Sequence, residues 1–79
     1  MIYVTMTDRF MSGWGLSEGK INKLVFECSD RMEAERVMDY AERRKDQSYI
    51  NLRTTRPSYP TRTHYTQFKT KTDYPNWYK

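Results

Sequence analysis

Residues that could bind a ligand or catalyse a reaction gather in three parts of this 79-residue sequence. The first part is the loop at 10–20, which holds all three glycines of the chain and Trp14. Its spacing fails as a phosphate-binding loop. The Walker pattern needs four residues between its first glycine and the Gly-Lys pair, but five separate Gly13 from Gly19 and three separate Gly15 from Gly19. Ile21 also stands where the pattern needs Ser or Thr. The loop is either a flexible connection whose Trp14 seals the core or the tip of a partner-binding surface.

The second part is the pair formed by Cys28 and His64, the only cysteine and the only histidine of the sequence. They could act together in nucleophilic catalysis only if their two strands were neighbours. A buried structural thiol and a surface imidazole explain them better. The carboxylates between 30 and 42 fit a helix cap and a solvated helix face, and no cluster has the spacing of metal ligands. The sequence therefore predicts no enzyme, no metal site and no cofactor.

The third part is the C-terminal third, where cations alternate with aromatic rings. Residues 49–79 carry six Lys/Arg and one Asp, a net charge of +5. Residues 1–48 carry eight Lys/Arg and nine Asp/Glu, a net charge of −1. Cations that track phosphates and rings that stack on bases are typical of single-stranded nucleic-acid binding. The candidate residues for this activity are Tyr49, Arg53, Arg56, Arg62, Tyr65, Lys69 and Lys71. An ordinary amphipathic strand with a basic solvated face has the same composition, so both interpretations stay open.

Aromatic residues and cations are also enriched at protein interfaces. Several of them fall in expected loops or in the tail. The candidate residues for contact with a protein partner are Trp14, Lys20, Tyr59 and Trp77. A small core gains from burying such residues, so a homodimer is a further expectation.

Strands and one helix must position these residues. Alternation of Ile2, Val4 and Met6 with polar or aromatic residues predicts a first strand, and Asp30-Arg31-Met32-Glu33 has the spacing of a helix capping box. The expected order is strand 2–8, Gly/Trp loop 10–20, strand 22–28, helix 31–45, strand 49–54, Pro loop 56–61, strand 63–70 and aromatic tail 73–79. The polarity of the last strand favours an edge position. We expect the tail to pack back on the protein or to dock elsewhere.

This order predicts a single domain of the α+β class: a two-layer unit with a mainly antiparallel four-stranded sheet and one amphipathic helix on one face. Two hairpin-like pairs, joined by the helix, would form the sheet. Its other face would be mixed, aromatic and basic, and is the natural binding surface. That face would carry Tyr3, Thr5, Lys23, Val25, Tyr49, Asn51 and Arg53.

Cysteine usage and hydropathy bear on the compartment. A single cysteine excludes an internal disulfide, no basic-then-apolar signal segment opens the sequence, and no apolar run approaches the roughly 20 residues that span a bilayer. We expect a cytoplasmic protein without a membrane partner.

Several runs of this sequence resemble small accessory proteins of tailed bacteriophages and prophages. The runs are Phe10-Met11-Ser12-Gly13-Trp14-Gly15, Glu18-Gly19-Lys20, Asn22-Lys23-Leu24-Val25, Tyr49-Ile50-Asn51-Leu52 and Asp73-Tyr74-Pro75. The resemblance implies a bacterial host cytoplasm and a non-enzymatic phage-type binding protein that inhibits or modulates a host macromolecular system. Such anti-defence or host-takeover proteins, anti-CRISPR proteins among them, bind a host protein or nucleoprotein complex. Direct binding of single-stranded nucleic acid through the C-terminal third is the alternative.

Overall fold

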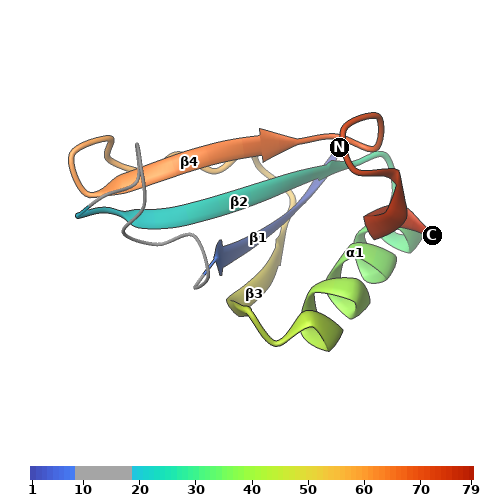
Figure 1. The fold of residues 1–79 in the computed structure, drawn as a ribbon. Helices are drawn as coiled ribbons and strands as arrows, with labels where there is room; N and C mark the ends of the chain where they lie inside the picture. Colours follow the sequence, from blue (N-terminus) through green and yellow to red (C-terminus); the bar gives the residue numbers. More distant parts are fainter. Residues whose placement is uncertain (9–18) are drawn as a thin grey trace.

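The computed structural model describes residues 1–8 and 19–79 and shows a four-stranded sheet with one helix packed on one face (Figure 1). The elements in chain order are β1 (Ile2–Asp8), β2 (Ile21–Cys28), α1 (Arg31–Arg44), β3 (Gln47–Arg53), β4 (His64–Lys69) and the short 3-10 helix η2 (Pro75–Tyr78). The expected α+β class and the order β-β-α-β-β are confirmed. The observed bounds of the strands and of α1 differ by at most two residues from the predicted ones.

The strand order is β3-β1-β2-β4. β1 pairs antiparallel with β2 and with β3, as expected of a mainly antiparallel sheet, but β2 and β4 run parallel, so the sheet is mixed. The expected second hairpin is wrong, because β3 and β4 lie at opposite edges. Their connection, residues 54–63, is a crossover that spans the sheet, and parallel pairing requires such a crossover in place of a tight turn.

The core lies between the sheet and α1. Alternation places Val4 and Met6 of β1, together with Leu24 and Phe26 of β2, on the face that packs against the helix. The helix contributes the buried residues Ala34, Val37 and Ala41. Its start is capped as the sequence predicts. Asp30 Oδ1 accepts a hydrogen bond from the Glu33 amide at 2.9 Å, and Glu33 Oε1 accepts from the Ser29 amide at 2.9 Å.

The aromatic tail packs back onto this core. In η2 the Trp77 ring stacks on Phe26, with centroids 4.5 Å apart, and lies 4.6 Å from the Tyr40 centroid. Tyr78 Oη donates a hydrogen bond to the Glu27 carbonyl at 2.8 Å. Only 7% of Trp77 is exposed, so its ring stabilises the core and is not presented to a partner.

The sheet face opposite α1 is less open than the sequence suggests. Thr5 and Val25 point to this face, and both are buried, at 2% and 0% exposed. The crossover lies over this face: Pro57 is buried, the Arg56 guanidinium sits on the Phe68 ring of β4, and Lys23 of β2 lies beside Tyr59. We call the sheet face opposite α1, with the crossover that lies over it, the groove face.

Candidate functional site

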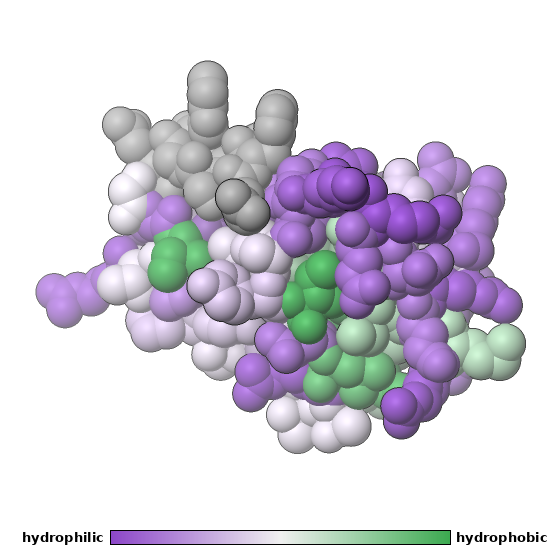
Figure 2. Space-filling model, turned by 90° about the horizontal axis from the view of Figure 1, so that it is seen from below, coloured by the Kyte–Doolittle hydropathy of each residue, from purple (hydrophilic) through white to green (hydrophobic). Residues whose placement is uncertain are grey.

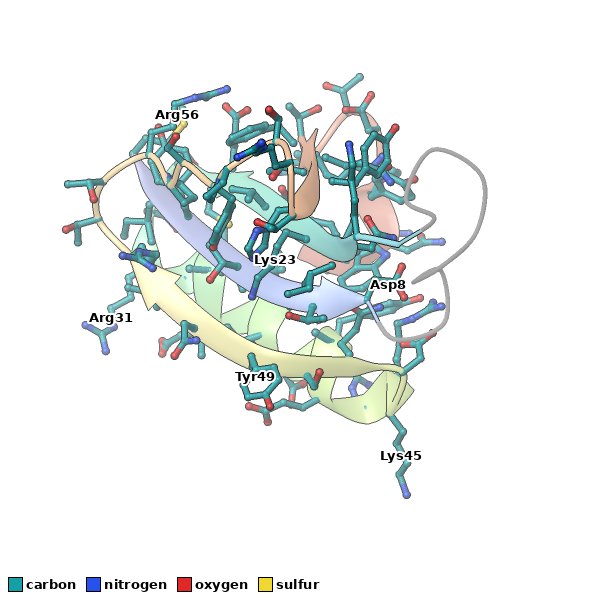
Figure 3. The ribbon with its side chains drawn as sticks, turned by 90° about the vertical axis from the view of Figure 1, so that its left-hand side faces the viewer. Asp8, Lys23, Arg31, Lys45, Tyr49 and Arg56 are labelled. Atoms are coloured by element: carbon teal, nitrogen blue, oxygen red, sulfur yellow. The ribbon has the colours of Figure 1, made fainter. Side chains whose placement is uncertain are left out.

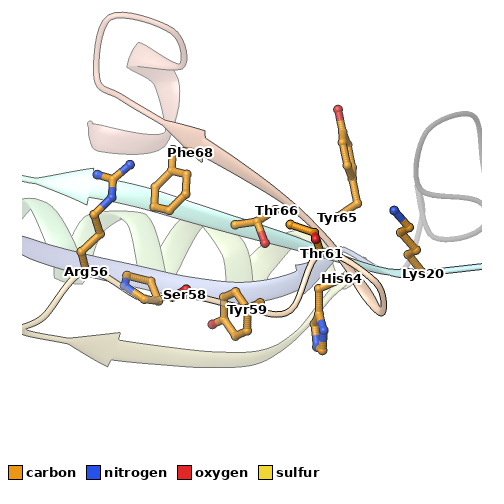
Figure 4. Close-up of a pocket in the computed structure, with 10 residues that line it drawn as sticks. Lys20, Arg56, Ser58, Tyr59, Thr61, His64, Tyr65, Thr66 and Phe68 are labelled. Atoms are coloured by element: carbon orange, nitrogen blue, oxygen red, sulfur yellow. The ribbon is translucent and has the colours of Figure 1, made fainter.

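A groove of about 590 Å³ runs between the crossover and β4 on the groove face (Figure 4). Its lining residues are Lys20, Arg56, Pro57, Ser58, Tyr59, Thr61, His64, Tyr65, Thr66 and Phe68. Two of these ten are Lys or Arg, four are aromatic when the imidazole is included, and none is a carboxylate. The lining therefore suits a ligand that is both anionic and aromatic.

Two prolines shape the wall that the crossover contributes. A proline ring fixes φ near −65° and removes an amide donor, so Pro57 and Pro60 favour an extended segment that does not join the sheet. The Pro60 carbonyl then accepts hydrogen bonds from the amides of Thr63 at 3.3 Å and His64 at 2.9 Å, which turns the chain into β4. This turn brings Tyr59 and His64 to the same end of the groove.

Each end of the groove holds a ring in contact with a planar group. At one end the rings of Tyr59 and His64 stack with centroids 5.2 Å apart and planes 21° apart, and Thr63 Oγ1 lies 2.8 Å from His64 Nδ1. At the other end Arg56 Cζ lies 3.9 Å from the Phe68 centroid. Arg56 also lies 3.8 Å from a carboxylate oxygen of Glu27, so part of its charge is already compensated. Both ends present flat surfaces on which a base can stack.

Lys23 lies beside the groove, beneath two tyrosines. Its Nζ is 5.4 Å from the Tyr59 centroid and 5.9 Å from the Tyr49 centroid. Partial burial, and then the positive charge of Arg53, lower the pKa of Lys23 from its usual value. A partly buried ammonium near a second cation would be stabilised by an added anion.

Tyr49 extends this surface across β3 (Figure 3). The β1–β3 register shifts between Thr5 and Thr7, so Met6 faces two residues of β3, one of which is Tyr49. At this bulge Tyr49 has φ of 54°, in the left-handed region that side chains disfavour, and 76% of it is exposed. Bulges and such backbone outliers occur preferentially at binding sites, where they re-aim a side chain.

The structure divides the predicted nucleic-acid residues between two faces. Tyr49, Arg53 and Arg56 lie on the groove face, and Tyr65 lines the groove but points away from His64 (Figure 4). Arg62 is exposed in the turn before β4.

The two lysines of the predicted nucleic-acid set lie on the α1 side of the sheet. Lys69 Nζ is 5.0 Å from the Tyr74 centroid, and Lys71 Nζ is 3.1 Å from Glu33 Oε2.

The predicted protein-contact residues separate as well. Lys20 and Tyr59 line the groove, Trp77 is in the core, and Trp14 falls outside the described residues. Neither Lys23 nor His64 is among the candidate contact residues, although the sequence places Lys23 on the sheet face expected to bind. The structure keeps Lys23 on the same face as Tyr3 and Arg53 and brings Tyr59 of the crossover beside it, which only the strand order determines.

Cys28 and His64 lie far apart although their strands are neighbours. The parallel register pairs His64 with Ile21 at one end of β2, and Cys28 is at the other end, on the core side. Burial raises the pKa of the Cys28 thiol to about 11. Within residues 1–8 and 19–79, no three His, Cys, Asp or Glu side chains come together as a metal site.

A second hollow of about 250 Å³ lies on the α1 side, between β2, β4 and η2. It mixes charges, since Asp8, Arg44 and Lys69 all line it, and its floor is the packed core residues Phe26 and Trp77. The first groove is larger and has one sign of charge, so we take it as the candidate site.

Comparison with protein-family models, curated proteins and solved structures gave no match. The site is therefore argued from its own geometry. In the described parts of the chain, no helix has both the length and the apolar character needed to cross a membrane.

Proposed function

We propose that this chain is a non-enzymatic protein that binds single-stranded nucleic acid through the groove face. One observation carries the proposal: the groove and the sheet beside it combine cations with flat rings, and no carboxylate lines the groove. The cations are Lys20, Lys23, Arg53 and Arg56, and the rings are Tyr49, Tyr59, His64 and Phe68. Cations that neutralise phosphates and rings that stack on bases are the two parts such a surface needs.

Single strands fit this surface better than duplexes. The flat groups line a groove, where only an unstacked base can reach them. A duplex is commonly read by a basic helix in its major groove. The exposed face of α1 alternates in charge, with Glu35, Arg36 and Asp39 along it, and therefore suits solvent rather than a phosphate backbone.

Binding to a host protein or nucleoprotein complex is the second proposal, and it follows from the resemblance to phage accessory proteins. The observation that favours it is Tyr49, since a largely exposed ring on a strained bulge is the kind of residue that anchors protein interfaces. Such a partner, inhibited or modulated during host takeover, would meet the same groove face. A homodimer stays a prediction. On the side that α1 and β3 occupy in Figure 1, hydrophobic residues gather near the middle of the face, with hydrophilic residues around them (Figure 2).

Fluorescence anisotropy with a labelled single-stranded oligonucleotide of about 16 nucleotides tests the first proposal, at salt concentrations from about 50 to 200 mM. Three phosphate contacts, from Lys20, Lys23 and Arg53, correspond to a slope of about −2 in log K against log salt, which is an affinity loss of about 18-fold across that range. Arg53→Gln should make the slope shallower by about 0.7. The matched control Arg36→Gln removes the same charge from the exposed face of α1 and should leave the slope unchanged.

Absence of binding to any single-stranded oligonucleotide at low salt would overturn the first proposal. The second proposal predicts that the protein recovers a defined partner from host lysate and that Tyr49→Ser abolishes the recovery. Recovery that Tyr49→Ser leaves unchanged would place the contact elsewhere.

A further inference from the structure

We infer that the groove is a nucleotide subsite, in which a base stacks at the Arg56–Phe68 end and a phosphate binds at the Lys20–His64 end. The inference rests on the proposed function, since it states what part of a strand the groove holds. The shared chemistry is an aromatic base joined to a phosphate, either in a free nucleotide or in one unit of a strand.

The size of the groove supports a ligand of this kind. Its volume of about 590 Å³ falls within the range of sites for small organic ligands, about 300–1,000 Å³. His64 and Phe68 are four positions apart on β4, which corresponds to about 13 Å along the strand. The groove is therefore long enough to place a base and its phosphate at separate ends.

The Arg56–Phe68 end suits the base. Arg56 Cζ lies 3.9 Å from the Phe68 centroid, and Arg56 is exposed, so its guanidinium is accessible from solvent. A guanidinium plane is a stacking platform for an unstacked base. Glu27, 3.8 Å from Arg56, compensates part of its charge and makes this end less attractive to phosphate.

The Lys20–His64 end suits the phosphate. None of the ion pairs among the described residues involves Lys20, so its ammonium is not compensated by a described carboxylate. The imidazole of His64, which points to the side opposite Lys20 in Figure 4, and the hydroxyl of Thr61 line the same groove and can each donate a hydrogen bond to a phosphate oxygen. Lys23, beneath the Tyr59 ring at 5.4 Å, adds a second positive charge.

Competition experiments test this inference on the full chain. A labelled oligonucleotide is displaced by adenosine 5′-monophosphate, by adenosine and by inorganic phosphate in turn. We expect the monophosphate to compete at least 10-fold better than either fragment. Arg56→Lys keeps the charge and removes the flat guanidinium, so it should weaken competition by the monophosphate at least 5-fold. The salt dependence of oligonucleotide binding should stay unchanged in this variant. Lys20→Gln should reduce the advantage of the monophosphate over adenosine.

The outcomes separate the subsite from the function. An oligonucleotide that binds but is not displaced by the monophosphate overturns the subsite and leaves the proposed function standing. Calorimetry measures binding of the monophosphate directly. If the monophosphate binds and oligonucleotides do not, the groove is a subsite for free nucleotides and the proposed function is overturned. A monophosphate that competes no better than inorganic phosphate, or an Arg56→Lys variant with unchanged competition, overturns the inference. Thermal unfolding of each variant confirms that it is folded.

Discussion

Truncation of Trp77 should remove a large part of the stability of this fold. The ring stacks on Phe26 of β2 and contacts Tyr40 of α1, and the Arg44 guanidinium lies 5.3 Å from its centroid. It therefore joins the last turn of the chain to both layers. Trp77→Ala would delete these contacts and leave a cavity under η2.

The magnitude follows from the burial of that ring. A buried tryptophan removes about 150–250 Å² from water, which at about 25 cal/mol per Å² gives about 4–6 kcal/mol as an upper bound. Measured truncations of this type cost about 3–5 kcal/mol. A chain of 79 residues has a total stability of about 4–12 kcal/mol. Trp77→Ala should therefore be marginally folded or unfolded.

Guanidinium denaturation followed by circular dichroism measures this loss. With a slope of about 2 kcal/mol per molar denaturant, a loss of 4 kcal/mol lowers the midpoint by about 2 M. Trp77→Phe keeps a ring against Phe26 and should lose less. Met32→Ala, which truncates a largely exposed side chain of α1, is the control and should leave the midpoint in place. A midpoint shift below about 0.5 M for Trp77→Ala would refute the role of the tail in the core.

Three further predictions concern single side chains. Cys28 should resist alkylation at pH 8 in the native protein and react after unfolding, because burial raises its pKa to about 11; prompt native labelling would contradict this. Hydrogen bonds from Ser29 and Lys71 lower the pKa of Glu33 to about 2, so its contribution to stability is complete above pH 4.5 and is lost as the pH falls toward 2. The midpoint temperatures of thermal unfolding of the native protein and of Glu33→Gln should therefore converge as the pH is lowered. A difference between the two midpoints that stays constant with pH would contradict this. Tyr49→Gly should be about 1 kcal/mol more stable than Tyr49→Ala, the reverse of the usual strand preference, because only glycine adopts a positive φ without strain. A less stable glycine variant would exclude backbone strain at the bulge.

Local patterns in the sequence were sufficient to predict the individual elements. Capping-box spacing located the start of α1, because Asp30 and Glu33 act on neighbouring amides. Two-residue alternation identified Val4 and Met6 as core residues, because a pleated strand must point successive side chains to opposite faces. The polarity of β4 correctly indicated an edge strand.

Long-range arrangement could not be predicted in the same way. The alternation within β3 and β4 is equally compatible with a hairpin and with two separate edges, and only tertiary packing chooses between them. The groove exists because residues 54–63 cross the sheet, so the meeting of Arg56 with Phe68 follows from that topology. The split of the basic residues has the same origin. Lys69 and Lys71 share a sequence segment with His64 and Phe68 but lie on the opposite side of the sheet.

Chemical-shift mapping on the uniformly ¹⁵N-labelled protein tests the central claim most directly, which is that the groove face binds single-stranded nucleic acid. Backbone amides are followed while an unlabelled single-stranded oligonucleotide is added at low salt. We predict the largest changes at Lys23, Tyr59 and Phe68, and small changes along the exposed face of α1 around Arg36. Changes centred on α1, or no change at saturating oligonucleotide, would contradict the claim.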